Sequence, residues 1–298
     1  MSNAGRHGVG SWRQSDKTGV HNRAIEATEA ALKVELVEDP TDPRIAGYRD
    51  VRDAGLRVRD GLFLAEGRLL VRRLLEASRF AVQSLLVTPP ALDDLRDLLA
   101  GDDSTPVHVA SAETIRTVVG FKFHRGCLAL GVRGEPLAPE ALVDPVGPRT
   151  LLALEGLADP DNVGAVFRNA AAFGAAGVLL SSHCADPLYR KAVRVSMGAT
   201  LSLPFARVAD WPAALAALRL AGYRLVALCP GVEAEDIALV AARAPRRPRL
   251  ALLLGAEGTG LSGTTRAAAD VAVRIPMAAG IDSLNVAAAC GIALHRLA

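Results

Sequence analysis

The C-terminal half of the chain contains four unbroken apolar runs, each followed by a polar or Gly-containing segment. These runs span residues 150–154, 177–181, 224–228 and 250–254. Buried strands of a parallel sheet have this pattern because helices cover both faces of the sheet. Helical segments are predicted between the runs, over residues 165–173, 188–197 and 211–221. This alternation predicts an α/β domain with a parallel sheet over residues 150–298.

The N-terminal half has shorter apolar segments. The strands predicted there are 62–65, 84–87, 107–109 and 127–132. The predicted helices are 44–60, 68–77 and 92–99. Together they predict a small α/β domain over residues 42–133. Proline and glycine are dense in residues 134–149, which indicates a linker. Residues 1–41 lack apolar periodicity, so we expect a disordered tail and lead-in there.

Ligands of open α/β sheets bind beyond the carboxyl ends of the strands, and three loops of the second domain lie at such positions. In the first loop, Asp159 and Pro160 mark a turn, and Asn162 is a predicted helix N-cap. Gly164 leaves room for a close backbone approach, and Arg168 follows one helical turn later. These groups could converge on one anion. An ordinary capped helix with a solvated arginine fits the spacing equally well.

The second loop is rich in glycine and carries a carboxylate. Gly255, Gly258 and Gly260 surround Glu257, directly after the apolar run at 250–254. The spacing matches neither a Walker loop nor a dinucleotide-binding fingerprint. A carboxylate would repel phosphate, so a neutral or cationic ligand fits better. The alternative is a glycine-rich turn with a solvated glutamate.

The third loop joins a strand to the final predicted helix, residues 284–297. It begins with Ile275, Pro276 and Met277 and reaches Ser283, the predicted N-cap, and Asn285. The alternative is a routine strand-to-helix connection.

Composition removes several classes of protein. Of the 298 residues, 50% are hydrophobic and 22% charged, which excludes a mostly disordered chain. The net charge is only +2, so a nucleic-acid surface would have to be a local patch. No apolar run approaches the ~20 residues of a membrane span. The four cysteines form no CxxC pair and no HExxH occurs, so we expect no metal site and a reduced, cytoplasmic setting.

Together, the three loops resemble the motifs of the SpoU/TrmH family of the SPOUT methyltransferase superfamily. The first motif, N-x-G-x-x-x-R-x-A, is matched by Asn162, Gly164, Arg168 and Ala170. The second is matched by Gly255, Glu257, Gly258, Gly260 and Leu261. The third is matched by Ile275, Pro276 and Met277 with Ser283, Leu284, Asn285 and Val286. The stretch Arg194-Val-Ser-Met-Gly-Ala is also similar. The catalytic resemblance covers residues 150–298.

The resemblance implies S-adenosylmethionine-dependent 2′-O-methylation of an RNA ribose. It implies a SPOUT α/β domain with a deep trefoil knot, a homodimer whose active site is shared between subunits, and a small α/β RNA-binding domain before it. The sizeable N-terminal domain favours ribosomal RNA over tRNA. A catalytically silent RNA-binding relative is the alternative, although Arg168, Glu257 and Asn285 are all present. A nucleotide-binding oxidoreductase lacks its glycine fingerprint.

The resemblance also assigns roles to individual residues. The cofactor would be held near Leu228, Gly255, Gly260, Ile275, Met277 and Leu284. The catalytic group would comprise Arg168, Asn162, Glu257, Ser283 and Asn285. RNA would be bound by Arg68, Arg72, Arg73 and Arg125. Arg168 would deprotonate the 2′-hydroxyl or, since a guanidinium stays protonated, position the adjacent phosphate. An apolar stripe of Leu284, Ala288 and Ile292 predicts the dimer contact.

Overall fold

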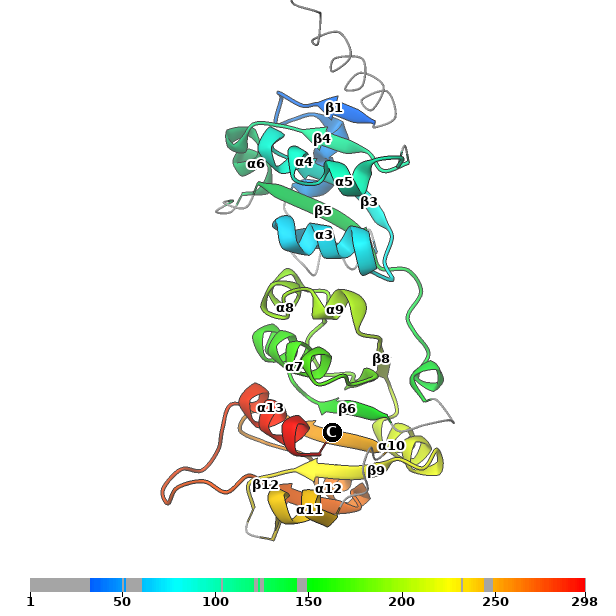
Figure 1. Cartoon of the computed structure of the whole chain (residues 1–298), viewed down its shortest axis with the longest axis vertical. Coiled ribbons are helices and arrows are strands. Elements are labelled where there is room, and N and C mark those ends of the chain that lie inside the picture. The colour runs from blue at the N-terminus through cyan, green and yellow to red at the C-terminus, as the bar shows by residue number, and fades with distance from the viewer. Residues whose placement is uncertain are drawn as a thin grey trace, which may run out of the picture.

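The computed structural model describes residues 33–49, 51, 61–102, 104–120, 123, 126–143, 149–231, 233–243 and 249–297. Two α/β units are stacked along the long axis of the molecule (Figure 1). Two short helices, α8 (Arg190–Val195) and α9 (Ala199–Ser202), lie between the two sheets. The architecture places the predicted catalytic loops in the second unit.

The second unit contains a seven-stranded sheet in which every pair of neighbours is parallel. From edge to edge its strands are β10 (Glu235–Asp236), β12 (Val271–Arg274), β9 (Arg224–Leu228), β11 (Leu250–Gly255), β6 (Thr150–Glu155), β7 (Gly177–Ser181) and β8 (Phe205–Val208). The prediction of a parallel α/β domain is confirmed. The threading of its C-terminal segment through a knot stays a prediction.

Both faces of this sheet are covered, which explains the unbroken apolar runs. Leu152 and Leu154 of β6 pack on one face, and Leu151 and Ala153 pack on the other. The first face is covered by α7 (Pro160–Ala172), α11 (Ile237–Arg243) and α13 (Val286–Leu297). The second is covered by η3 (Pro139–Leu142), α10 (Trp211–Leu220) and α12 (Gly263–Ala268). Sequence patterns missed β8, α11 and α12, which are short.

The first unit is a five-stranded mixed sheet. Its strands, in order, are β1 (Val34–Leu36), β4 (Val107–Val109), β3 (Val82–Val87), β5 (Cys127–Val132) and β2 (Leu62–Glu66). One face is covered by α3 (Arg68–Ala77), α4 (Pro89–Asp93) and α5 (Arg96–Leu99). The other is covered by η1 (Pro43–Tyr48) and α6 (Ala112–Val119). The small α/β unit expected before the linker is therefore present.

Several predicted boundaries in the first unit are wrong. The described part of the expected helix 44–60 contains the 3-10 helix η1, after which Arg49 is extended; residues 50 and 52–60 lie outside the described part. The buried Tyr48 ends it and donates a 2.8 Å hydrogen bond to the carbonyl of Ser84. The expected helix 92–99 is split between α4 and α5. Strand β1 pairs with β4, although residues 1–41 were expected to be a tail and lead-in.

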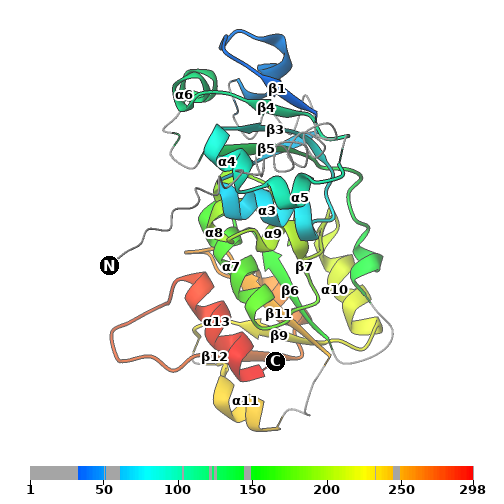
Figure 2. The same ribbon diagram turned by 45° about the horizontal axis from the view of Figure 1, so that its top comes forward.

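The two units share one apolar core. Leu188, Val193 and Leu201 of the second unit belong to the same buried cluster as helix α3. The guanidinium of Arg79 lies 4.7 Å from the ring centre of Phe80 and 4.6 Å from that of Phe205, one ring from each unit. Figure 2 shows α8 and α9 directly below α3. This shared core fixes the first unit against α8 and α9, which lie between the first and second of the three loops along the chain.

The helix predicted over 188–197 is shorter than expected. Helix α8 ends at Val195, and Met197 and Gly198 both have positive φ angles, 53° and 83°. A left-handed pair of residues cannot continue a right-handed helix, so the chain turns and starts α9.

Candidate active site

A cavity of about 590 Å³ opens at the carboxyl ends of β9, β11 and β12, which are neighbours in the sheet. All six residues predicted to hold the cofactor line it: Leu228, Gly255, Gly260, Ile275, Met277 and Leu284. Glu257, Ser283 and Asn285 line it too. Sequence patterns missed Cys229, Pro230 and Asp282, which adjoin predicted positions. The structure thus brings the second and third loops to one cavity.

The glycine-rich loop closes on itself. The Gly260 N–H donates to the Ala256 carbonyl at 2.9 Å, and Gly258 and Gly260 have φ angles of 84° and 67°. A Cβ atom on Gly255 would overlap the backbone of Gly260 and Leu261. Glycine at 255 is therefore required by the loop's own fold. Its conformation turns the Glu257 side chain and backbone groups toward the cavity.

A carboxylate from the neighbouring strand anchors this loop. Glu155, the last residue of β6, accepts a 2.9 Å hydrogen bond from the Ser262 N–H through Oε2. The Ser262 hydroxyl in turn accepts from Thr265 N at 3.1 Å and caps α12. Sequence reasoning assigned Glu155 no role. The sequence did contain one signal for such a role, because Glu155 directly follows the apolar run predicted to be a strand.

Asn285 joins all three loops. Its Oδ1 accepts from Ala287 N at 2.9 Å, which caps α13. Because Oδ1 is committed to backbone donors, Nδ2 must face acceptors. It donates to Asn162 Oδ1 at 2.9 Å and to Glu257 Oε1 at 3.0 Å. The predicted residues Asn162, Glu257 and Asn285 therefore form one network.

Two predicted helix caps are wrong. Asp159 caps α7 by accepting from Asp161 N at 2.9 Å, and Pro160 occupies the first helical turn, where its missing N–H costs nothing. Asn162 lies inside the helix, where it is buried and bonded to Asn285. Asn285 rather than Ser283 caps α13, so Leu284 precedes the helix. Ser283 is exposed at the cavity.

Gly164 has a different role from the one expected. A Cβ at this position would lie 2.6 Å from the carbonyl oxygen of Ala192 in α8. The missing side chain therefore lets α7 pack closely against α8, rather than giving a ligand room. A glycine is suited both to a close approach of a ligand and to a close contact between helices. The sequence pattern alone therefore could not distinguish these two roles.

Arg168 lies on α7, one turn beyond Gly164, and is exposed. It does not line the cavity. Within the described residues its guanidinium has neither a hydrogen bond nor an ion pair. The next residue, Asn169, donates through Nδ2 to the Ala287 carbonyl at 2.6 Å and fixes α7 against α13. Asn169 was missed by the sequence analysis and positions the helix that carries Arg168.

The cavity wall near β9 is uncharged. Partial burial raises the pKa of the Cys229 thiol above its ordinary value. The thiol is therefore neutral near pH 7 and is a poor nucleophile. The carboxylate of Glu257 lies at the cavity and accepts a hydrogen bond from Asn285. This arrangement favours a ligand that combines apolar surface with positive charge.

The predicted RNA-binding arginines have internal partners. Arg68 forms an ion pair with Asp94, and Arg73 donates to the carbonyl of Met197. Arg72 donates to both carboxylate oxygens of Asp97, at 2.9 and 2.7 Å. Arg125 lies outside the described residues.

Nowhere among the described residues do three or more His, Cys, Asp or Glu side chains gather in a way that could hold a metal ion. No helix in the described part of the chain is long and apolar enough to cross a membrane.

Comparisons with known proteins agree with this geometry. Residues 149–295 match the SpoU rRNA Methylase family. An uncharacterized tRNA/rRNA methyltransferase from Mycobacterium tuberculosis is 45% identical over 89% of this chain and 92% of its own length. The 23S rRNA (guanosine-2′-O-)-methyltransferase RlmB of a Burkholderia species is 36% identical over 66% of this chain and 79% of its own length.

A solved structure shares the whole fold. The AdoMet-bound rRNA methyltransferase from Sinorhizobium meliloti superimposes with a TM-score of 0.76 at 26% identity, covering 89% of this chain and 97% of that one. The loops, the cavity and these relatives lead to one conclusion: the chain is a methyltransferase that belongs to the SpoU family.

Proposed function

We propose that the protein transfers a methyl group from S-adenosylmethionine to the 2′-hydroxyl of a ribose in ribosomal RNA. The observation that carries the proposal is the network of Asn285, which joins Asn162 and Glu257 at the mouth of the cavity. The relatives named for 2′-O-methylation of 23S rRNA support the choice of ribosomal RNA over tRNA.

The cavity fits the cofactor in size and chemistry. Its volume, about 590 Å³, lies within the range of pockets that enclose a small organic ligand. Leu228, Ile275, Met277 and Leu284 offer apolar surface for an adenine ring, and the loop of Gly255 and Gly260 offers backbone groups. The bound cofactor supplies an electrophilic methyl group on a cationic sulfonium, and the carboxylate of Glu257 offsets that charge.

The attacking 2′-hydroxyl is a weak nucleophile that loses its proton as it attacks. A guanidinium is a donor with no acceptor site, so in the proposal Arg168 acts as a charged donor rather than as a base. In the proposal it binds the phosphate next to the target ribose and offsets the charge that develops on the attacking oxygen. Asn162, Ser283 and Asn285 orient the ribose and Glu257.

We further propose that a homodimer completes the site. Arg168 does not line its own cavity, which supports a role in the cavity of a second subunit. Apolar side chains are exposed directly after α7, directly before α13 and along α13. These are Phe173, Leu284, Ala288 and Ile292. Such a stripe fits a two-fold symmetric contact. A single monomeric species in light scattering at micromolar concentration would contradict the dimer.

Mixing two inactive variants tests the shared site. Arg168→Ala loses the guanidinium, and Gly255→Val blocks the loop. Random mixing makes half heterodimers, each with one intact site, so activity should return to about a quarter of the wild-type value. A mixture as inactive as its components would place Arg168 and the cofactor in the same subunit.

The proposal places the protein in the cytoplasm, with RNA bound by Arg68, Arg72, Arg73 and Arg125 of the first unit. All four cysteines are free thiols, which suits a reducing compartment. The decisive experiment incubates the protein with labelled S-adenosylmethionine and unmodified rRNA or tRNA transcripts and maps the methylated nucleotide. One 2′-O-methylated position in rRNA is expected. Tight RNA binding without transfer would instead indicate a catalytically silent relative.

Cofactor binding has its own test. The branched side chain of Gly255→Val would collide with Gly260. Calorimetry should therefore show an S-adenosylmethionine affinity at least about tenfold weaker than that of the wild type. This factor corresponds to the loss of roughly one good polar contact. Gly231→Val, at a glycine with open space around it, is the matched control. Equal affinity in all three proteins would show that the cofactor binds at another site.

A further inference from the structure

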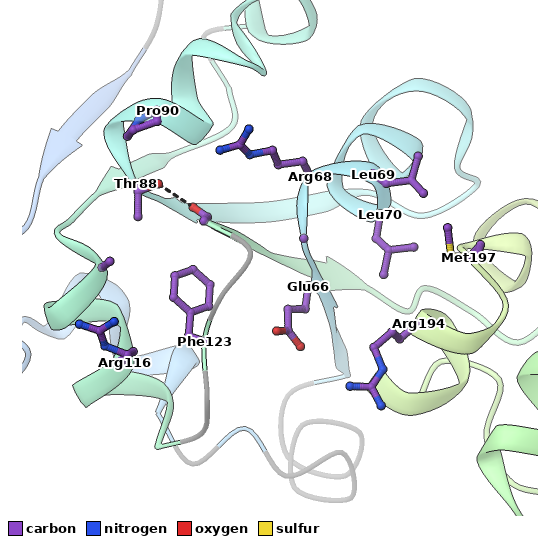
Figure 3. Close-up of a pocket in the computed structure, with 13 residues that line it drawn as sticks. Glu66, Arg68, Leu69, Leu70, Thr88, Pro90, Arg116, Phe123, Arg194 and Met197 are labelled. Atoms are coloured by element: carbon purple, nitrogen blue, oxygen red, sulfur yellow. Dashed lines mark hydrogen bonds between the residues drawn. The ribbon is translucent and has the colours of Figure 1, made fainter.

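A second cavity, of about 650 Å³, lies where the first unit meets α8 (Figure 3). Its walls come from the start of α3, from α6, from the residues around β5, and from the turn between α8 and α9. The residues that define its chemistry are Glu66, Arg68, Arg116, Phe123, Arg194 and Met197. It is separate from the cofactor cavity, with which it has no lining residue in common.

The cavity has positive charge from three sides. Figure 3 shows Arg116, Arg68 and Arg194 on different walls. Arg116 and Arg194 are exposed, and among the described residues neither guanidinium has a partner. Arg68 is bonded to Asp94 at the edge. Figure 3 shows these two guanidinium groups on opposite sides of the cavity, with Phe123 and Glu66 between them, so each is suited to a separate anionic group.

One acceptor lies among these cations. Glu66 is only 7% exposed, and its Oε2 is held by Arg190 at 3.1 Å. A ligand that carried only negative charge would be repelled by this carboxylate. The lining therefore suits a ligand with an anionic end and a separate hydrogen-bond donor.

The remaining wall is apolar. Phe123 and Leu70 are buried at the cavity, while Leu69 and Met197 are 45% and 37% exposed. Large side chains that stay exposed inside a cavity lined by cations indicate a surface that a flat or apolar ligand covers.

The backbone at Met197 is strained. It is the one residue other than glycine with a positive φ in the described part of the chain. Two contacts hold it there: Arg73 donates to its carbonyl, and the Ser196 hydroxyl accepts from Gly198 N at 3.2 Å. Strain of this kind costs about 1–3 kcal/mol and is typical of ligand sites. Here it places Met197 on the wall of the cavity.

We propose that this cavity binds one unpaired nucleotide of the RNA substrate. The proposal rests on the function proposed above. The phosphates on the two sides of the nucleotide contact Arg116 and Arg194, the base covers Leu69 and Met197, and an amino group of the base donates to Glu66. Carboxylates accept from base amino groups in this way. Proteins that read RNA sequence commonly take bases from single-stranded loops, whose edges are free.

Helix α8 links this cavity to the catalytic helix. Arg190 holds Glu66 of the cavity, and the next residue, Lys191, pairs with Asp161 of α7 at 2.8 Å. Gly164 lets the two helices pack closely. A nucleotide in the cavity is therefore held at a fixed place relative to α7, and it selects which ribose reaches Arg168.

Arginine variants of the full-length protein give the first test. Arg116→Ala and Arg194→Ala should each weaken binding of a 23S rRNA transcript about tenfold, as expected for a lost charged hydrogen bond. Each should reduce the slope of log affinity against log salt by about 0.7. Arg224→Ala is the control, since Arg224 is the exposed first residue of β9 and does not line the cavity. Arg194→Lys keeps the charge and should recover most of the affinity.

Crosslinking locates the nucleotide. A photoreactive benzoylphenylalanine at Leu69 should crosslink to one or two unpaired nucleotides of the same transcript. The same group at Leu220, which is 90% exposed on α10, should not. Loss of the Leu69 crosslink in Arg116→Ala and Arg194→Ala would tie it to the cavity. Crosslinks spread over helical RNA, or equal at both positions, would overturn the proposal.

The outcome is distinguishable from failure of the proposed function. If the wild type methylates rRNA while Arg116→Ala and Arg194→Ala behave like Arg224→Ala, the nucleotide site is wrong and the function stands. If no RNA is methylated by the wild type, the proposed function fails. Calorimetry with S-adenosylmethionine should give wild-type affinity for every arginine variant, and a loss there would show that the substitution disturbs the fold.

Discussion

Two regions of the molecule differ in whether their charged side chains have partners within the protein. One is the surface of α3 and α5, and the other is the region around the cavity at the carboxyl ends of the parallel strands. On the first surface, Arg68, Arg72 and Arg73 are bonded to acceptors of the protein itself. At the second, Arg168 is free of partners within the described residues, and only Oε1 of Glu257 is bonded. A paired arginine must break its internal bonds before it can contact a phosphate. The difference teaches that an arginine's partners, rather than its residue type, indicate whether it awaits a ligand.

The largest effect should come from Arg168→Lys. Lysine keeps the charge but loses the planar fork that grips a phosphate. We expect single-turnover methyl transfer to fall by about 10²–10³, with cofactor affinity within a few-fold of wild type. Transfer of labelled methyl to rRNA and calorimetry measure the two quantities. Near-normal transfer would reduce Arg168 to a generic positive charge and weaken the comparison.

A smaller loss is expected for Asn285→Asp. Aspartate still caps α13, so thermal stability should hardly change. It replaces the donor to Asn162 and Glu257 by a second carboxylate, and methyl transfer should fall about 10- to 100-fold. Asn285→Ala is the companion variant, because it also removes the cap and should cost about 1 kcal/mol of stability. Full activity in Asn285→Asp would show that the network only holds the helix.

The paired and unpaired arginines can be compared directly. The double variant Arg72→Ala/Arg73→Ala should weaken RNA binding only a few-fold, because the internal bonds of these arginines compete with phosphate. The loss of their internal bonds should lower the free energy of unfolding by ~1 kcal/mol or less. Arg116→Ala with Arg194→Ala should weaken RNA binding more without lowering stability. Filter binding and urea unfolding provide the readouts. The reverse order of RNA affinities would break the comparison.

The smallest effect concerns pH and the first unit alone. Burial lowers the pKa of His108, although Glu35 lies 3.3 Å away. The fold therefore favours the neutral ring, whose contribution is present above pH ~6.5 and is lost as the pH falls through the lower folded pKa. Urea unfolding should show lower stability at pH 5 than at pH 7.5, and His108→Gln should flatten this dependence. If the pH dependence of the stability were unchanged in His108→Gln, it would have to come from other titratable groups.

The sequence identified most of the site because its elements are local. Apolar runs predicted the parallel strands, and the ends of these runs and the loops after them contain all six residues predicted to hold the cofactor, which line the cavity. Helix caps were harder to predict, since Asp159 and Asn162 are both good capping residues and only the position of Pro160 and the contact with Asn285 separate them. The break at Arg49 within the expected helix 44–60 was not predicted, because it follows the burial of Tyr48 against a strand that is distant in the chain.

The sequence alone determined the parallel sheet, the three loops and the family, because each depends on residues close together in the chain. Only the tertiary structure decided which arginines are paired, that Gly164 serves helix packing, and that Asn285 connects three loops. These features join residues that are distant in the chain, and some of them, such as Arg73 with Met197 and Asn162 with Asn285, are more than 100 positions apart. Pairing at such separations follows from how the packed helices approach one another, and no local pattern records it.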